Sequence, residues 1–115
     1  MPWLKRRAVT IMRRLFAVIR SRGAGWDEAR ALEMQDGWNA HAQFMNALAA
    51  EGFVLVGGPL EGTRETLLAV RAESEGEIRR RLSDDPWGED MLKLSRIAPW
   101  LLRLGEERLA VETLG

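Results

Sequence analysis

The clearest hydrophobic pattern near the start of the chain covers residues 14–20, where five consecutive apolar residues lie between two arginines. A short run that is apolar on both alternating faces is typical of a strand covered on both sides. Similar runs over residues 53–56 and 66–72 predict two further strands. The turn region over residues 60–65 favours a hairpin between them.

The pattern changes to a helical period over residues 33–50. At about 100° per residue, the apolar side chains fall within one arc and the polar ones lie opposite. Gly52 supplies a C-terminal stop. The sequence therefore predicts an amphipathic helix whose buried arc contains Met34, Trp38, His41, Met45, Leu48 and Ala49.

A second helix is predicted after the hairpin. Ser74 and Glu77 form a capping box, which marks a helix N-terminus. The helix is expected to end at Asp85, because Pro86 disfavours helical geometry in the residue before it. A last strand is predicted over residues 92–104, interrupted by Pro99.

The predicted order β-α-β-β-α-β indicates an α+β, ferredoxin-like fold with a four-stranded antiparallel sheet and two helices on one face. The last strand then lies at a sheet edge, where Pro99 is tolerated. Three strands are apolar on both faces, although the helices cover only one face. We therefore expect a homodimer in which the free sheet faces of two copies pack together.

Two glycine-rich segments are interpreted as turns. One contains Gly57, Gly58 and Pro59, and the other contains Gly23 and Gly25. Both segments lack the pattern of a phosphate-binding loop and that of a dinucleotide fingerprint. Glycine lets a backbone approach a ligand closely, so Gly58 and Pro59 stay candidates for substrate contact.

Composition narrows the function classes. The 115 residues suit one domain, and 17 basic against 17 acidic residues leave no net charge to attract nucleic acid or an anionic membrane. The absence of cysteine removes thiol chemistry and fits a reducing cytoplasm, and a single histidine argues against a zinc site. We expect no metal and no cofactor.

The first fourteen residues carry five basic residues and no acid. One interpretation is a basic arm for RNA or lipid headgroups; the neutral overall charge favours a flexible leader over residues 1–12. Met12 is also a possible natural start. The apolar runs are too short for a secretory signal or a membrane span. We predict one domain over residues 13–104, followed by a charged tail over residues 105–115.

His41 is the likeliest chemical centre. A lone histidine on an apolar face is usually a core residue with satisfied ring nitrogens. Alternatively, a nearby ionised carboxylate fixes the imidazole tautomer and makes it a base usable near neutral pH. Asp85 is the best-placed partner, because it ends the second helix on the same sheet face; the simpler interpretation is a helix-stop residue.

Tryptophans surround this pair in the sequence. Trp38 is one helical turn from His41, Trp87 follows Asp85-Pro86, and Trp26 lies in the loop before the helix. Aromatic walls suit a flat organic ligand. They suit a core equally well, which is the first interpretation for Trp38.

Five segments stand in a distinctive order and spacing: the opening strand with Arg20-Ser21-Arg22-Gly23, residues 38–45 around His41, residues 52–60, Ala72-Glu73-Ser74 and Asp85-Pro86-Trp87. Together they resemble the YCII-related family of small dimeric α+β barrel proteins. The resemblance covers about residues 13–104. It implies that His41 and Asp85 are an active-site pair; the family commonly has phenylalanine where Trp87 stands.

Two functions of different classes follow. Some relatives of that family are similar to cofactor-free dehydrochlorinases and isomerases of hydroxylated rings, which implies an acid/base lyase or isomerase using His41 and Asp85 on a small cyclic substrate. The alternative is a non-catalytic dimeric domain that binds a small molecule, with the pair only structural. Nucleic-acid binding through the basic arm ranks behind both.

Overall fold

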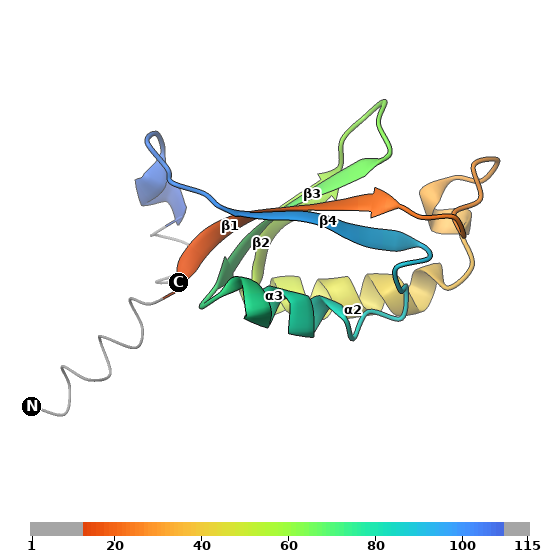
Figure 1. Cartoon of the computed structure of the whole chain (residues 1–115), viewed down its shortest axis with the longest axis horizontal. Helices are drawn as coiled ribbons and strands as arrows, with labels where there is room; N and C mark the ends of the chain where they lie inside the picture. Colours follow the sequence, from red (N-terminus) through yellow and green to blue (C-terminus); the bar gives the residue numbers. More distant parts are fainter. Residues whose placement is uncertain (1–12, 110–115) are drawn as a thin grey trace, which may run out of the picture.

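The structure, a computed structural model, describes residues 13–109 of the 115-residue chain. It is an α+β fold built on one four-stranded sheet (Figure 1). The elements follow the predicted order, with a short 3-10 helix added before the first α-helix. They are β1 (Arg14–Arg22), η1 (Leu32–Met34), α2 (Trp38–Ala50), β2 (Val54–Pro59), β3 (Glu65–Ala72), α3 (Glu75–Leu82) and β4 (Leu92–Pro99).

The sheet has the order β2-β3-β1-β4, and all three pairings are antiparallel. Figure 1 shows α2 and α3 on the same side of this sheet. The predicted antiparallel four-stranded sheet is confirmed, and the arrangement is consistent with a ferredoxin-like fold. β4 is an edge strand and ends at Pro99, so the prediction that it continues to residue 104 is wrong.

The core lies between the sheet and the two helices. Alternate residues of β1 and β3 point towards it: Phe16 pairs with Val70, and Val18 pairs with Leu68. The opposite residues of each strand face the other side of the sheet. The core cluster consists of Phe16, Val18, Leu48, Phe53, Val54, Leu68, Val70, Ala72, Ile78 and Leu82.

The first α-helix begins later than predicted. Gly37 has φ 80°, a left-handed conformation that ends the continuous helical pattern, and α2 starts at Trp38. Met34 therefore belongs to η1 and is 66% exposed instead of lying on the buried arc. Ala49 is also exposed, whereas His41 and Leu48 are buried as predicted.

The interpretation of Gly57, Gly58 and Pro59 as a turn is wrong. All three lie in β2, paired with β3, and the turn follows them. β2 is an edge strand, which tolerates a proline at its end. A Cβ at Gly57 would lie 2.5 Å from Leu68 Cδ2, so glycine is needed for close approach to β3.

The second helix also ends earlier than predicted. Ser74 caps it, accepting a hydrogen bond from the Glu77 amide, but α3 stops at Leu82. Asp85 lies in the turn that follows. Its amide still donates to the Leu82 carbonyl, so the turn continues directly from the last helical residue.

The predicted leader over residues 1–12 and the last residues of the predicted tail lie outside the described residues. Residues 106–109, at the start of that tail, form a helical turn. Within residues 13–109, no helix combines the length and apolar character needed to cross a bilayer.

Candidate functional site

His41 and Asp85 contact each other inside the fold. The imidazole Nδ1 lies 2.9 Å from both carboxylate oxygens of Asp85, although the two residues are 44 positions apart. His41 comes from the sheet-facing side of α2, and Asp85 from the turn after α3. Both are buried, with 7% and 6% of their surface exposed.

A local turn holds the Asp85 carboxylate in place. Its Oδ1 accepts a hydrogen bond of 2.9 Å from the Trp87 amide, two residues further on. This contact is the usual Asx-turn geometry. Pro86, between the two, restricts the backbone of Asp85 to extended conformations. The Asp85-Pro86-Trp87 segment thus orients the carboxylate through contacts that do not involve His41.

Arg20 completes a buried network that sequence reasoning missed. Its Nη1 donates to Asp85 Oδ2 at 2.7 Å, and its Nη2 donates to the Leu92 carbonyl at 3.1 Å. The Arg20 side chain is 4% exposed. One signal was present in the sequence: Arg20 follows Phe16 and Val18 at the strand period of two, and a charge at such an inward position requires a buried partner.

Asp85 is ionised in this network. Burial is the largest influence on its pKa and acts to raise it, but hydrogen bonds from His41, Arg20 and the Trp87 amide outweigh burial and lower the pKa below 3.8. An ionised carboxylate only accepts hydrogen bonds. His41 Nδ1 must therefore carry a proton and donate it, which leaves Nε2 as the nitrogen with the lone pair whenever the ring is neutral.

Trp87 lies flat against the imidazole. The two ring centroids are 4.0 Å apart with an interplanar angle of 14°. The indole is itself anchored, because its Nε1 donates to the Asp36 carbonyl at 2.7 Å and it forms a T-shaped contact with Trp26. Trp87 is 3% exposed, so it supports His41 from the protein interior.

An apolar cavity of about 230 Å³ opens beside His41. Nε2 has no hydrogen-bond partner among residues 13–109. It is also not one of the fully buried side-chain atoms without a partner in that range, so we infer that it is accessible from the cavity. Polar residues of the lining include Thr66, Arg20 and Arg22. The lining consists of Arg20, Arg22, Trp26, Leu32, Trp38, His41, Met45, Gly57, Gly58, Pro59, Thr66, Leu68 and Leu92.

Most of the predicted ligand contacts meet at this cavity. Trp26, Trp38, Gly58 and Pro59 line it together with His41. Trp87 does not line it, because the Asp85-Pro86-Trp87 turn directs the indole behind the imidazole. Gly58 and Pro59 reach the cavity as residues of β2, where extended backbone replaces the predicted turn.

Arg22 is a second residue that the sequence did not single out. Its guanidinium lies over the Trp26 ring at 4.6 Å from the centroid, a cation–π geometry. Nη1 is 3.8 Å from the Glu28 carboxylate, a long and partly exposed contact. Arg22 therefore brings positive charge to the cavity lining, with Glu28 as a distant counter-ion. Its position two residues beyond Arg20 on β1 was the available signal.

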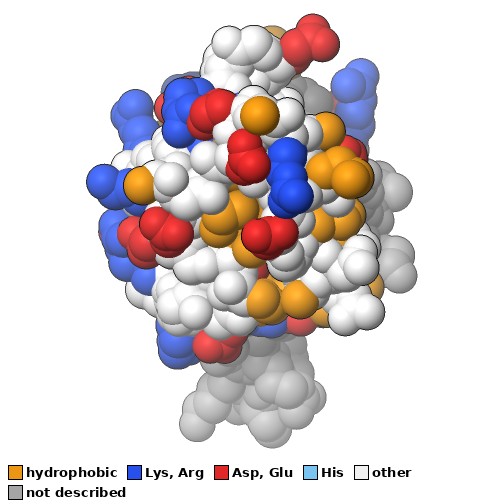
Figure 2. All heavy atoms as spheres, turned by 90° about the vertical axis from the view of Figure 1, so that its right-hand side faces the viewer, with side chains coloured by type: hydrophobic (Ala, Val, Ile, Leu, Met, Phe, Trp, Pro, Cys, Tyr) orange, Lys and Arg blue, Asp and Glu red, His pale blue; other side chains and the backbone are white. Residues whose placement is uncertain are grey.

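The molecular surface at the β1–α2 connection is mixed. Figure 2 shows the end of the molecule that carries this connection, with hydrophobic, acidic and basic side chains interspersed.

Among residues 13–109, no three His, Asp or Glu side chains gather in a way that would hold a metal ion.

Comparison with known proteins adds no identification: no protein-family model and no curated protein matches the chain. The resemblance to the YCII-related family therefore rests on the sequence segments quoted above. The candidate site is defined by the contacts among His41, Asp85 and Arg20 and by the cavity beside His41.

Proposed function

We propose that this protein is a cofactor-independent acid/base enzyme, of lyase or isomerase type, that acts on a small cyclic organic substrate. The observation that carries the proposal is the pairing of His41 Nδ1 with the ionised Asp85, which leaves Nε2 open to an apolar cavity. A base whose tautomer and orientation are held by a carboxylate is the arrangement that general base catalysis requires.

In this mechanism, Nε2 of neutral His41 takes a proton from a substrate carbon. The imidazolium that forms is stabilised by the Asp85 carboxylate, which Arg20 and the Trp87 amide keep ionised. In a lyase, the electron pair left on carbon expels a leaving group from the neighbouring carbon. In an isomerase, the electron pair shifts a double bond, and the imidazolium returns the proton to a different carbon.

The cavity supports a small substrate. Its volume of about 230 Å³ is below the usual range for drug-sized ligands, and its walls include Trp26 and Trp38. Flat aromatic side chains favour a planar or ring-shaped ligand. The absence of cysteine is compatible with a reducing compartment, and we propose the cytoplasm.

Hydrogen–deuterium exchange tests the proposal without a known substrate. A panel of small cyclic ketones, lactones and chlorinated cyclic alcohols is incubated with the full chain in D2O, and loss of C–H signal is followed by proton NMR. We expect protein-dependent exchange in at least one class. His41→Asn should slow that exchange by about a hundredfold or more, because the variant lacks the base.

Asp85→Asn should also slow the exchange, because His41 loses the carboxylate that orients it, and Asp84→Asn is its matched control. Asp84 is the exposed neighbour of Asp85 and makes no contact with His41, so its replacement should leave exchange unchanged. Exchange that persists in His41→Asn would rule out the histidine as the base. If panel members bind in a thermal-shift assay but none exchanges, the protein is a binding domain.

That alternative, a non-catalytic domain that binds a small molecule, is favoured by one observation. His41 is only 7% exposed and belongs to a buried network with Arg20 and Asp85, as expected for a structural histidine. The alternative predicts that His41→Gln lowers the melting temperature while ligand-induced stabilisation persists.

We also propose that two copies of the chain form a homodimer through the free sheet face. We further propose that the chain belongs to the YCII-related family, which has a dimeric α+β barrel architecture. The face opposite α2 and α3 carries seven apolar side chains beside Arg71 and Arg96, and packing against a second copy would remove these apolar side chains from water. Val56 is one of them and is 64% exposed. The apolar residues on this face are Leu15, Ala17, Ile19, Val56, Leu67, Ala69 and Ala98.

Light scattering after size-exclusion chromatography tests the dimer. The wild-type protein should have twice the mass of one chain, and Val56→Lys should shift it to the monomer. Val56 is exposed in the single chain, so the substitution leaves the core intact. Gln43→Lys, on the exposed side of α2, is the control and should stay dimeric. A monomeric wild-type protein would refute this part of the proposal.

A further inference from the structure

A larger cavity lies at the other end of β1 from Arg20 and Arg22. Its volume is about 540 Å³, within the usual range of ligand-binding sites. Leu15 of β1 and Arg71 of β3 form part of it, and these two residues pair across the sheet on the face opposite the helices. None of its lining residues belongs to the His41 cavity.

The chain after β4 builds the wall of this cavity. The Trp100 amide donates to the Leu15 carbonyl at 2.9 Å, which ties the start of this segment to β1. Gly105 then turns the chain, with φ 74°, into the helical turn that carries Glu106. Figure 1 shows this turn on the side of the sheet opposite α2 and α3.

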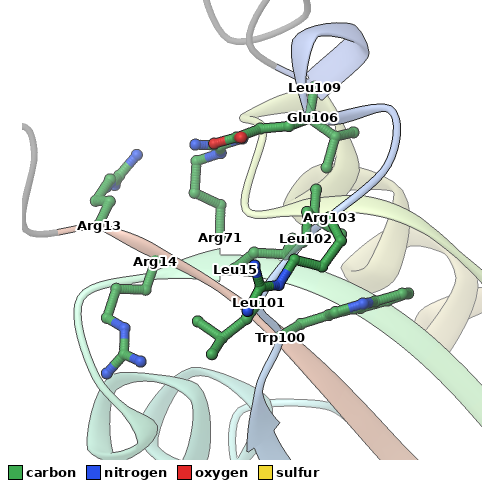
Figure 3. A pocket seen from close by; sticks show the side chains of 10 residues that line it. All are labelled: Arg13, Arg14, Leu15, Arg71, Trp100, Leu101, Leu102, Arg103, Glu106 and Leu109. Atoms are coloured by element: carbon green, nitrogen blue, oxygen red, sulfur yellow. The ribbon is translucent and has the colours of Figure 1, made fainter.

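The cavity is strongly cationic. Arginines 13, 14, 71 and 103 line it against a single acid, Glu106. Figure 3 shows Arg71 extending from the sheet towards the segment with Glu106, whereas Arg14 is turned away. The Arg14 guanidinium lies instead near the Phe16 ring, 5.8 Å from its centroid. Three arginines are left at the cavity in a chain with no net charge.

These three guanidinium groups have no partner in the described part of the chain. Neither Arg13, Arg71 nor Arg103 forms an ion pair or a side-chain hydrogen bond with any residue from 13 to 109. Arg71 is the most constrained, because its Nε is buried without an acceptor. A buried donor without an acceptor carries a desolvation cost, which an oxyanion relieves.

Apolar surface adjoins the charge. Trp100 is 40% exposed and Leu101 is 75% exposed, and both line the same cavity. An arginine fork binds carboxylate and phosphate oxygens in pairs, and an exposed indole offers a flat surface to a hydrocarbon body. The two features together describe a ligand with an anionic head and an apolar body.

We infer that this cavity binds a small organic anion, a carboxylate or a phosphate monoester, independently of His41. Arg71 holds the anionic head, and Arg13 and Arg103 add positive charge to the cavity wall. The apolar body lies against Trp100. In the single chain the site is open to solvent, so the charged contacts weaken as ionic strength rises.

Titration calorimetry with the full chain and three related probes tests the site. The probes are 2-naphthoate, 2-naphthyl phosphate and the neutral 2-naphthylmethanol, so the head group is the only part that changes. At least one anion should bind, and the better of the two identifies the head group. The neutral probe should not bind measurably at the same concentrations. Equal binding of the neutral probe would overturn the inference.

Variants locate the binding. Arg71→Gln should raise the dissociation constant of the anion about tenfold or more, as expected for loss of a charge-assisted pair. Arg103→Gln, at an exposed position, should act in the same direction and serves as the second variant if Arg71→Gln folds poorly. Arg80→Gln removes an exposed arginine of α3 outside the cavity and should change nothing.

His41→Asn separates the two cavities. The anion should bind this variant as it binds the wild-type protein, because no lining residue is shared. Unchanged affinity in both Arg71→Gln and Arg103→Gln, or affinity lost in His41→Asn, would overturn the inference. Neither result depends on whether His41 is catalytic.

Discussion

The imidazole of His41 lies parallel to the indole of Trp87, with the ring centroids 4.0 Å apart. Asp85 meets the same imidazole at its Nδ1 edge, and the Trp87 amide in turn donates to Asp85. Residues 85–87 therefore contact the histidine through both its edge and one of its faces. The orientation of the imidazole depends on a single turn, the one that follows α3.

This relationship predicts a graded response at position 87. Trp87→Ala should lower the free energy of unfolding by about 3–5 kcal/mol, because it removes a buried indole and leaves a cavity. Trp87→Phe keeps a ring against His41 but loses part of the buried indole and the hydrogen bond to the Asp36 carbonyl, so it should cost less, about 1–3 kcal/mol. Urea denaturation measures both. Equal losses would show that the ring against the imidazole contributes little.

The ionised state of Asp85 predicts how stability depends on pH. Its pKa is lowered below 3.8 in the folded protein, so the unfolded chain binds the proton more readily. Its contribution to stability is fully present above the unfolded pKa and is lost as pH falls through the folded value. Above about pH 5, Asp85→Asn should cost about 3–5 kcal/mol, because Arg20 is left without its counter-ion. That cost should shrink towards pH 2.

Denaturation midpoints of the wild-type protein and Asp85→Asn between pH 6 and pH 2 measure this difference. Asp84→Asn, at the adjacent exposed position, should follow the wild-type curve throughout. A constant gap between the wild-type protein and Asp85→Asn would mean that Asp85 does not titrate differently in the folded and unfolded chains.

The contact between His41 and Asp85 could be anticipated because each residue carries a local signal. His41 stands at helical spacing between Trp38 and Met45, and Pro86 marks the end of the segment that holds Asp85. Both signals depend on neighbouring residues only. The order of helices and strands along the chain was predictable for the same reason, since apolar runs and turn residues alternate along the sequence.

Features that depend on strand register and on turn geometry were harder to anticipate. Arg20 shares the inward face of β1 with Phe16 and Val18, but no neighbouring residue indicates that its partner is Asp85, 65 positions away. Trp87 was expected at the ligand, but the Asx turn at Asp85 directs it behind the imidazole. Gly57 was expected in a turn, but its close approach to Leu68 explains it as a strand residue.

The pairing of Arg20 with Asp85 predicts strong non-additivity. Arg20→Met and Asp85→Asn should each cost about 3–5 kcal/mol, because each leaves a buried charge without its partner. The double variant should cost about 1–3 kcal/mol less than the sum of the single variants. Arg22→Met provides the control cycle with Asp85→Asn, since Arg22 lies against Trp26 and should be additive. Additivity in the Arg20 cycle would contradict a direct coupling.

Trp87 lies close to Gly37, the residue before α2, whereas Gly62 has open surroundings. Gly37 and Gly62 both have φ 80°, so alanine at either position costs about 1 kcal/mol or more in backbone strain. A Cβ at Gly62 would meet nothing within 4 Å, whereas a Cβ at Gly37 would lie 3.0 Å from Trp87 Nε1. Gly37→Ala should therefore cost roughly 1 kcal/mol more than Gly62→Ala, because the indole must shift against His41. Urea denaturation of the two variants measures the difference, and equal losses would mean that the indole has room to move away from α2.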